Sequence, residues 1–114
     1  MPEQPAYKTL EVYGLSKQLA VACYELTHGL PADEKSNFTR YIRTAALNLH
    51  INIAQGAFQK PKKRKYFIRE AKNALVIIDA ATEILVELRL VTVEDTELIK
   101  TLSEKCFQLL EEME

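Results

Sequence analysis

An apolar residue recurs every three or four positions in the stretch FIREAKNALVIIDAATEILVEL, residues 67–88. Spacing of this kind places apolar side chains on one side of an α-helix, whereas a half-buried strand would need strict alternation. We expect a helix over residues 62–90, with Pro61 at its start because proline suits the first helical position. Its predicted buried stripe comprises Phe67, Ala71, Ala74, Leu75, Ile78, Ala81, Leu85 and Leu88.

Three other segments show the same spacing, and we expect helices over residues 9–28, 35–58 and 93–112. Short connections make neighbouring helices antiparallel. The sequence therefore predicts an all-α fold, an antiparallel up-down-up-down four-helix bundle that forms a single domain over residues 1–114. The buried positions expected in these helices are Leu15, Leu19, Ala22, Cys23 and Leu26, then Phe38, Ile42, Ala45, Leu49 and Ile53, and finally Leu98, Leu102, Cys106, Leu109 and Met113.

Local signals mark the helix ends. Gly29 and Pro31 end the first helix, since glycine suits a C-terminal cap and proline cannot continue a helix. Thr92 with Asp95 resembles a capping box before the last helix. Gly14 lies inside the first helix, where close packing against another helix would explain it.

A second apolar stripe lies beside the first one on the predicted third helix. It comprises Ile77, Ala80, Ile84 and Val91, and one core cannot easily use both stripes. An apolar surface this wide suggests burial against another subunit, so we expect these four residues to form an oligomer interface. A deeply central helix in a monomer explains the pattern equally well.

The formal net charge of −1 hides a strong asymmetry along the chain. Residues 35–72 contain ten basic side chains and one acidic side chain, Glu70, which is a net charge of +9. The rest of the chain contains five basic and fifteen acidic residues, which is a net charge of −10. Charge separated in this way bears on the partners of a protein and not on its fold.

Five cations occur within six residues in the segment KPKKRK, residues 60–65. They repel one another unless an anion neutralises them, and phosphate is the natural anion. The positive end of the predicted third helix lies at the same place, and an aromatic ring follows on which a base can stack. A solvated basic turn that pairs with acidic residues of another subunit is the alternative. The predicted nucleic-acid-binding residues are Lys60, Lys62, Lys63, Arg64, Lys65, Tyr66, Arg69, Lys72, Arg40 and Arg43.

No constellation of catalytic or metal-binding residues emerges. His28 and His50 fall on different predicted helices, and neither has an acidic residue at metal-ligand spacing. Ser16, Ser36 and Ser103 have no recognisable activating partner. We therefore expect no enzyme activity, no catalytic residue, no metal and no cofactor.

The compartment follows from the absence of export and membrane signals. Cys23 and Cys106 fall on apolar helix faces, where we expect buried free thiols of a reducing compartment. No apolar run approaches the roughly 18 residues that a membrane span needs. The first ten residues lack both the basic start and the apolar block of a secretory signal. We expect a cytoplasmic protein with no membrane association.

Several short motifs carry a resemblance to a known family. They are LEVY at residues 10–13, YELTHGLP at 24–31, and NIAQG at 52–56 followed by the basic segment and FIREA at 67–71. With these motifs the chain resembles the bacterial four-helix-bundle proteins encoded in 23S rRNA intervening sequences. That superfamily includes the accessory variability determinants of diversity-generating retroelements. The resemblance covers residues 7–113, and Gln55 replaces the acidic residue of the family signature Asn-Ile-Ala-Glu-Gly.

The resemblance implies a homopentamer of four-helix bundles with basic surfaces, and neither hydrolysis nor a cofactor. For the retroelement branch it implies binding of a reverse transcriptase and its template RNA in support of mutagenic cDNA synthesis. Together with the residues, it predicts a non-enzymatic accessory protein that binds RNA or DNA and a reverse transcriptase. The alternatives are an intervening-sequence-type protein–protein interaction module and a small bundle enzyme with an unfamiliar site.

Overall fold

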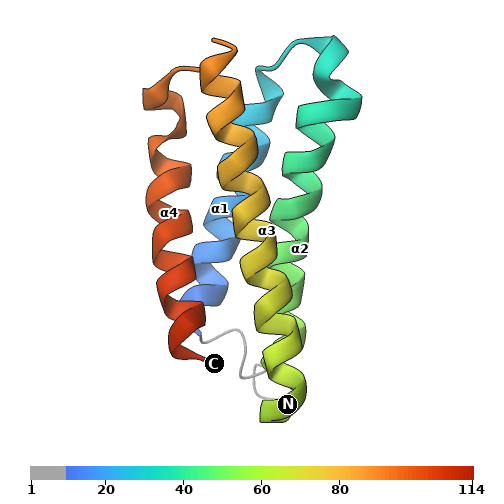
Figure 1. Ribbon diagram of the computed structural model, residues 1–114, viewed down its shortest axis with the longest axis vertical. Coiled ribbons are helices and arrows are strands. Elements are labelled where there is room, and N and C mark those ends of the chain that lie inside the picture. The colour runs from blue at the N-terminus through green and yellow to red at the C-terminus, as the bar shows by residue number, and fades with distance from the viewer. Residues whose placement is uncertain (1–9) are drawn as a thin grey trace, which may run out of the picture.

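The computed structural model describes residues 10–114, which form four antiparallel α-helices and no strand (Figure 1). The helices are α1 (Glu11–His28), α2 (Arg40–Gly56), α3 (Pro61–Glu87) and α4 (Val93–Glu112). Each helix packs against the next, and α4 packs back against α1, so the four surround a shared core. The predicted all-α, up-down-up-down bundle is confirmed.

The helix predicted over residues 35–58 is shorter than expected at both ends. The chain enters it through a 3₁₀ turn, η2 (Ala32–Glu34), and a π turn, η3 (Lys35–Thr39), before regular α2 begins at Arg40. The chain leaves α2 at Gly56. An apolar pattern cannot distinguish these tighter and wider turns from an α-helix, because all three present side chains with similar spacing.

The start of α4 agrees with the prediction because its signal is local. The amide of Asp95 donates to Thr92 Oγ1 at 3.1 Å, and the amide of Thr92 donates to Asp95 Oδ2 at 2.9 Å. This is the predicted capping box, and α4 has the predicted bounds. The hydrogen bond from the backbone of Thr92 also lowers the pKa of Asp95. The predicted start of the first helix, at residue 9, lies outside the described residues.

The end of α3 differs from the prediction, which extended this helix to residue 90. Arg89 has a φ of 60°, in the left-handed region. Its amide donates to the carbonyl of Val86 at 2.9 Å, and the amide of Leu90 donates to that of Leu85 at 3.0 Å. These are the two hydrogen bonds of a Schellman motif, a helix end that usually carries glycine. An arginine at this position gives no sequence signal, which is why the helix was predicted too long.

The core contains most of the predicted apolar positions, including Leu19, Ile42, Leu49, Ile78 and Leu85, all of which are fully buried. Cys23 and Cys106 are also fully buried and free, as predicted. Burial raises the pKa of Cys23 to about 12 and that of Cys106 to about 11.

On α4 the predicted stripe is wrong at Leu98, which is 59% exposed while the adjacent Ile99 is buried. Leu109 is partly buried against the core as expected, and its neighbour Leu110 is fully buried. Each pair is two adjacent apolar residues, about 100° apart around the helix, so periodicity alone cannot choose between them. Leu88 was also predicted to be buried, but it is exposed because it follows the end of α3.

A buried glycine lies at the contact between α2 and α3, the most extensively packed pair of helices. Gly56 is buried, and a Cβ atom at this position would lie 2.9 Å from Cβ of Phe67. Close packing was predicted for Gly14 instead, which is wrong, because a Cβ atom there would meet nothing within 4 Å. Gly56 therefore lets the end of α2 approach the start of α3.

We expect Gly56→Ala to lower the free energy of unfolding by about 1–3 kcal/mol, because Phe67 Cβ is close to the backbone and cannot move aside freely. Gly14→Ala is the matched control in open space, and it should raise the free energy of unfolding by up to about 1 kcal/mol. Urea-induced unfolding followed by circular dichroism measures both. Equal effects of the two substitutions would show that the contact with Phe67 is unimportant.

Candidate nucleic-acid interface

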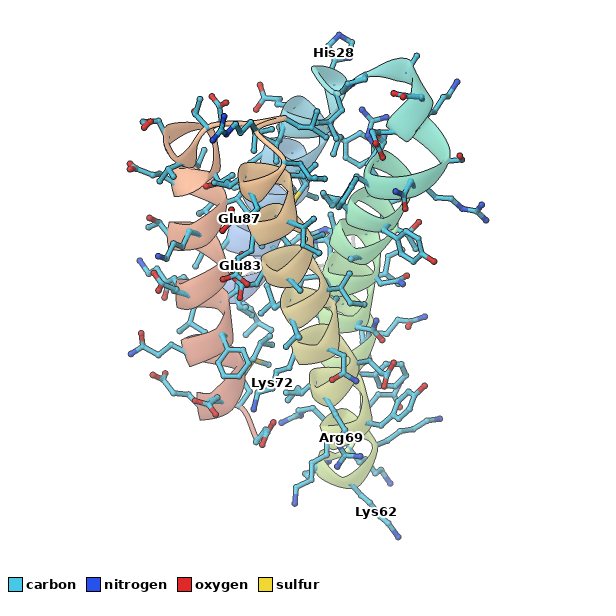
Figure 2. All side chains as sticks on the ribbon, turned by 45° about the horizontal axis from the view of Figure 1, so that its top comes forward. His28, Lys62, Arg69, Lys72, Glu83 and Glu87 are labelled. Carbon is cyan, nitrogen blue, oxygen red and sulfur yellow. The ribbon has the colours of Figure 1, made fainter. Side chains whose placement is uncertain are left out.

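The basic segment lies at one end of the bundle, where a short turn joins α2 to α3. Lys60 is extended and Pro61 is the first helical residue, so the lysines that follow occupy the first turn of α3. Lys62, Lys63 and Lys65 are exposed, and Figure 2 shows Lys62 projecting from the tip of the helix. We call residues 60–69 the basic end.

Arg64 has a structural role within the basic end. Its side chain is half-buried, and Nη2 donates to the carbonyl oxygen of Gln59 at 3.2 Å. Its Nε is buried and has no hydrogen-bond partner among the described residues. Arg64 therefore holds the turn before α3, and its charge is less available to a partner than those of the neighbouring lysines.

Tyr66 adds an exposed aromatic ring to the basic end. The ring is 55% exposed and meets the edge of Phe67, with ring centroids 5.2 Å apart and planes at 80°. An edge-to-face contact of this kind fixes the orientation of a ring. Tyr66 thus has the exposure that base stacking requires, beside the exposed Lys62 and Lys65.

Lys72 is placed differently from the other predicted cations, because carboxylates of the same chain neutralise it. Its side chain is 16% exposed, and its Nζ lies 2.5 Å from Glu114 Oε1 and 3.7 Å from Glu111 Oε2. The hydrogen bond from Lys72, together with the charges of Lys72, Arg69 and Lys65, lowers the pKa of Glu114. Lys72 joins α3 to the end of α4, whereas Arg69 is exposed (Figure 2).

Arg40 and Arg43 do not join the basic end, because they lie at the opposite end of α2. Arg43 is also occupied: its Nε donates to Thr27 Oγ1 at 2.8 Å, and its guanidinium lies over the ring of Tyr24 at 4.5 Å. The structure thus brings together the predicted residues from 60 to 69 and separates these two arginines from them. The ten basic residues lie in one continuous stretch of sequence, but the length of α2 separates Arg40 and Arg43 from the basic end.

The predicted oligomer residues lie on the outer side of α3. Ile77 is 44% exposed and Ile84 is 51% exposed, and Ala80 between them is exposed. Val91 follows the end of the helix and is half-buried against the core, so it does not continue this row. The neighbouring α2 exposes Ile51, and residues 44–59 contain no Asp, Glu, Lys or Arg, whereas the exposed Leu47 lines a groove with Val21 and Tyr24 of α1.

One contact between α1 and α2 was missed by the sequence analysis, which found no partner for Ser16. Ser16 Oγ lies 2.7 Å from His50 Nδ1 and donates to the carbonyl of Tyr13 at 2.9 Å. The rings of His50 and Tyr13 are 4.4 Å apart. The two polar residues are 34 positions apart, and no local motif could have paired them.

The contact between Ser16 and His50 joins α1 to α2. Ser16 is fully buried, so its hydroxyl is not accessible to solvent. Burial, and secondarily the charge of Lys17, lowers the pKa of His50. Within residues 10–114, no three His, Cys, Asp or Glu side chains are grouped to hold a metal ion.

Comparison with known protein families gives one match. The family described as 23S rRNA-intervening sequence protein matches residues 8–112, which is most of the chain. No curated protein matches it. In the part of the chain that the structure describes, no helix combines the length and the apolar character that crossing a membrane requires.

His50 makes stability depend on pH, because its lowered pKa means that the folded protein favours the neutral ring. The contribution of the neutral His50 ring to the free energy of unfolding should be complete above pH 6.5, the ordinary pKa of histidine. It should be lost as the pH falls from there through the lower pKa of the folded state. His50→Gln should lose this part of the pH dependence, and His28→Gln, at an exposed position, should keep it. Urea unfolding at several pH values tests this. An unchanged pH profile in His50→Gln would contradict it.

Proposed function

The chain belongs to the 23S rRNA-intervening sequence protein family, and we propose that it is a non-enzymatic protein that binds the phosphate backbone of RNA or DNA through its basic end. The observation that carries this proposal is the set of exposed cations at the start of α3, with no acidic residue in the first turn. Positive charges there oppose the helix dipole, which favours anions at this end. They weaken the helix unless an anion binds.

The described ion pairs support a role for these cations in binding. Among residues 10–114, ion pairs involve Lys72 and Lys105, whereas the lysines of the basic end take part in none. Phosphate oxygens can take the position that carboxylates take beside Lys72. The exposed ring of Tyr66 adds a surface for an unpaired base.

The exposed apolar residues of α3 bear on the assembly of the protein. The row Ile77, Ala80 and Ile84, together with the uncharged exposed side of α2, forms a surface suited to a second copy of the chain. We propose a homo-oligomer built on this α2–α3 surface. The pentamer and the reverse transcriptase partner rest on the family resemblance and stay predictions.

Binding should be steeply salt-dependent and localised to the basic end. We expect Lys62→Glu/Lys65→Glu to weaken binding of an RNA hairpin about tenfold or more, because each lost phosphate contact removes counterion release. The slope of log affinity against log salt should fall by about 1.5 for the two lost contacts. Fluorescence anisotropy over a salt series measures both, and circular dichroism checks that the helices persist.

The matched control is Lys35→Glu/Arg40→Glu, which makes the same charge change at the opposite end of α2. It should leave the affinity within about twofold. Equal losses in the two variants would reject the localised site. Tighter binding of polyglutamate than of RNA or DNA hairpins would support the protein–protein module instead.

Assembly should depend on the exposed isoleucines of α3. Ile77→Glu/Ile84→Glu should convert the oligomer to a monomer, because charged groups would be buried at the contact. Val21→Glu/Leu98→Glu alters two equally exposed residues on α1 and α4 and should leave the oligomer intact. Sedimentation velocity distinguishes these outcomes. A monomeric wild-type protein at micromolar concentration would refute the interface.

A further inference from the structure

Among the neighbouring helices of the bundle, α3 and α4 pack least extensively, and a groove lies between them. Its volume is about 920 Å³. Apolar side chains from both helices line it, namely Leu75, Val76, Val86, Val93, Ile99 and Phe107. Val76 and Val93 are 59% and 58% exposed, so the apolar lining is open to solvent.

Acidic residues stand along both walls of this groove. Asp79, Glu83 and Glu87 follow one another at intervals of four on α3, and Glu97 and Glu104 lie on α4. Figure 2 shows Glu83 and Glu87 on the side of α3 toward α4, far from Lys62 and Arg69. Lys100 is the one basic residue among those that line it. We call this feature the acidic groove.

These carboxylates are not explained by the fold of the chain. None of the five takes part in an ion pair among the described residues. Like charges four positions apart on a helix destabilise it by a few tenths of a kcal/mol per pair. The acidic groove therefore combines exposed apolar surface with five carboxylates against the single cation of Lys100, which is the pattern of a binding surface.

We propose that the acidic groove binds a cationic amphipathic helix of a protein partner. The apolar face of such a helix would cover Val76 and Val93, and its Lys or Arg side chains would pair with the carboxylates on either side. The groove extends along α4 from Val93 to Phe107, about 21 Å at the rise of an α-helix, so it suits a helix of about 14 residues. Lys72, whose Nζ lies 5.1 Å from the centre of the Phe107 ring, bounds its lower end.

Two other occupants fit the groove less well. RNA or DNA has the same charge sign as Glu83 and Glu87, so phosphate would be repelled. A second copy could offer the lysines of its basic end and the ring of Tyr66, but the aliphatic residue of that helix turn, Ile68, is buried in its own core. A separate amphipathic helix offers both an apolar face and cations.

The probe is a synthetic Leu/Lys peptide of about 18 residues with leucines at intervals of three and four. A peptide of the same composition with scrambled order is its control. We expect the amphipathic peptide to bind in fluorescence anisotropy and Glu83→Gln/Glu87→Gln to weaken it roughly tenfold. Glu25→Gln/Glu112→Gln makes the same charge change at exposed positions outside the acidic groove and should change the affinity less than about twofold.

The apolar lining is tested separately with Val76→Ser, which should weaken the amphipathic peptide, and Val21→Ser, an equally exposed valine on α1, which should not. Equal losses in groove and control variants, or equal affinity for the scrambled peptide, would overturn the proposal. A change in the sedimentation coefficient of Glu83→Gln/Glu87→Gln without peptide would show that a second copy covers the groove, and would also overturn it. RNA binding at the basic end is measured independently in the same variants.

Discussion

The close approach of α2 and α3 at Gly56 is the constraint on which the rest of the structure depends. With no side chain at Gly56, the end of α2 can lie against Phe67, and a turn of a few residues can join the helices. That turn determines where α3 begins, and so where its lysines project. Gly56 ends the NIAQG motif and Phe67 begins the FIREA motif, so the two motifs meet in space. Their contact sets how closely the end of α2 can lie to the start of α3.

A single helix, α3, carries both of the charged surfaces. Its first turns are positive and exposed, and its later turns contribute Asp79, Glu83 and Glu87 to the acidic groove. Along an ideal helix the nearest charges of the two surfaces, Arg69 and Asp79, are about 15 Å apart, and Lys62 and Glu87 are about 38 Å apart, so the salt of the cell largely screens one surface from the other. Under the proposals above, the two surfaces bind different partners. The uncharged exposed side of α2 is a third surface, separate from the basic end and from the acidic groove.

Local signals predicted the fold better than they predicted the site. Thr92 and Asp95 lie three residues apart, and their capping box could be read directly from the sequence. Arg89 could not be recognised as a helix end, because its left-handed conformation is set by the surrounding turn. Lys72, joined to Glu114 on another helix, and Arg43, held against α1, look in the sequence like any other cation. Burial and tertiary pairing decide which charges are free, and neither is a property of local spacing.

The two fully buried thiols make it possible to measure how often individual helices of the bundle open. Cys23 lies on α1 and Cys106 on α4, so an alkylating reagent can reach either sulfur only when a helix separates from its neighbours. The modification rate of each thiol thus reports the opening equilibrium of its own helix. Similar rates would identify one cooperative unit, and a faster rate at Cys106 would identify α4 as the helix that detaches first.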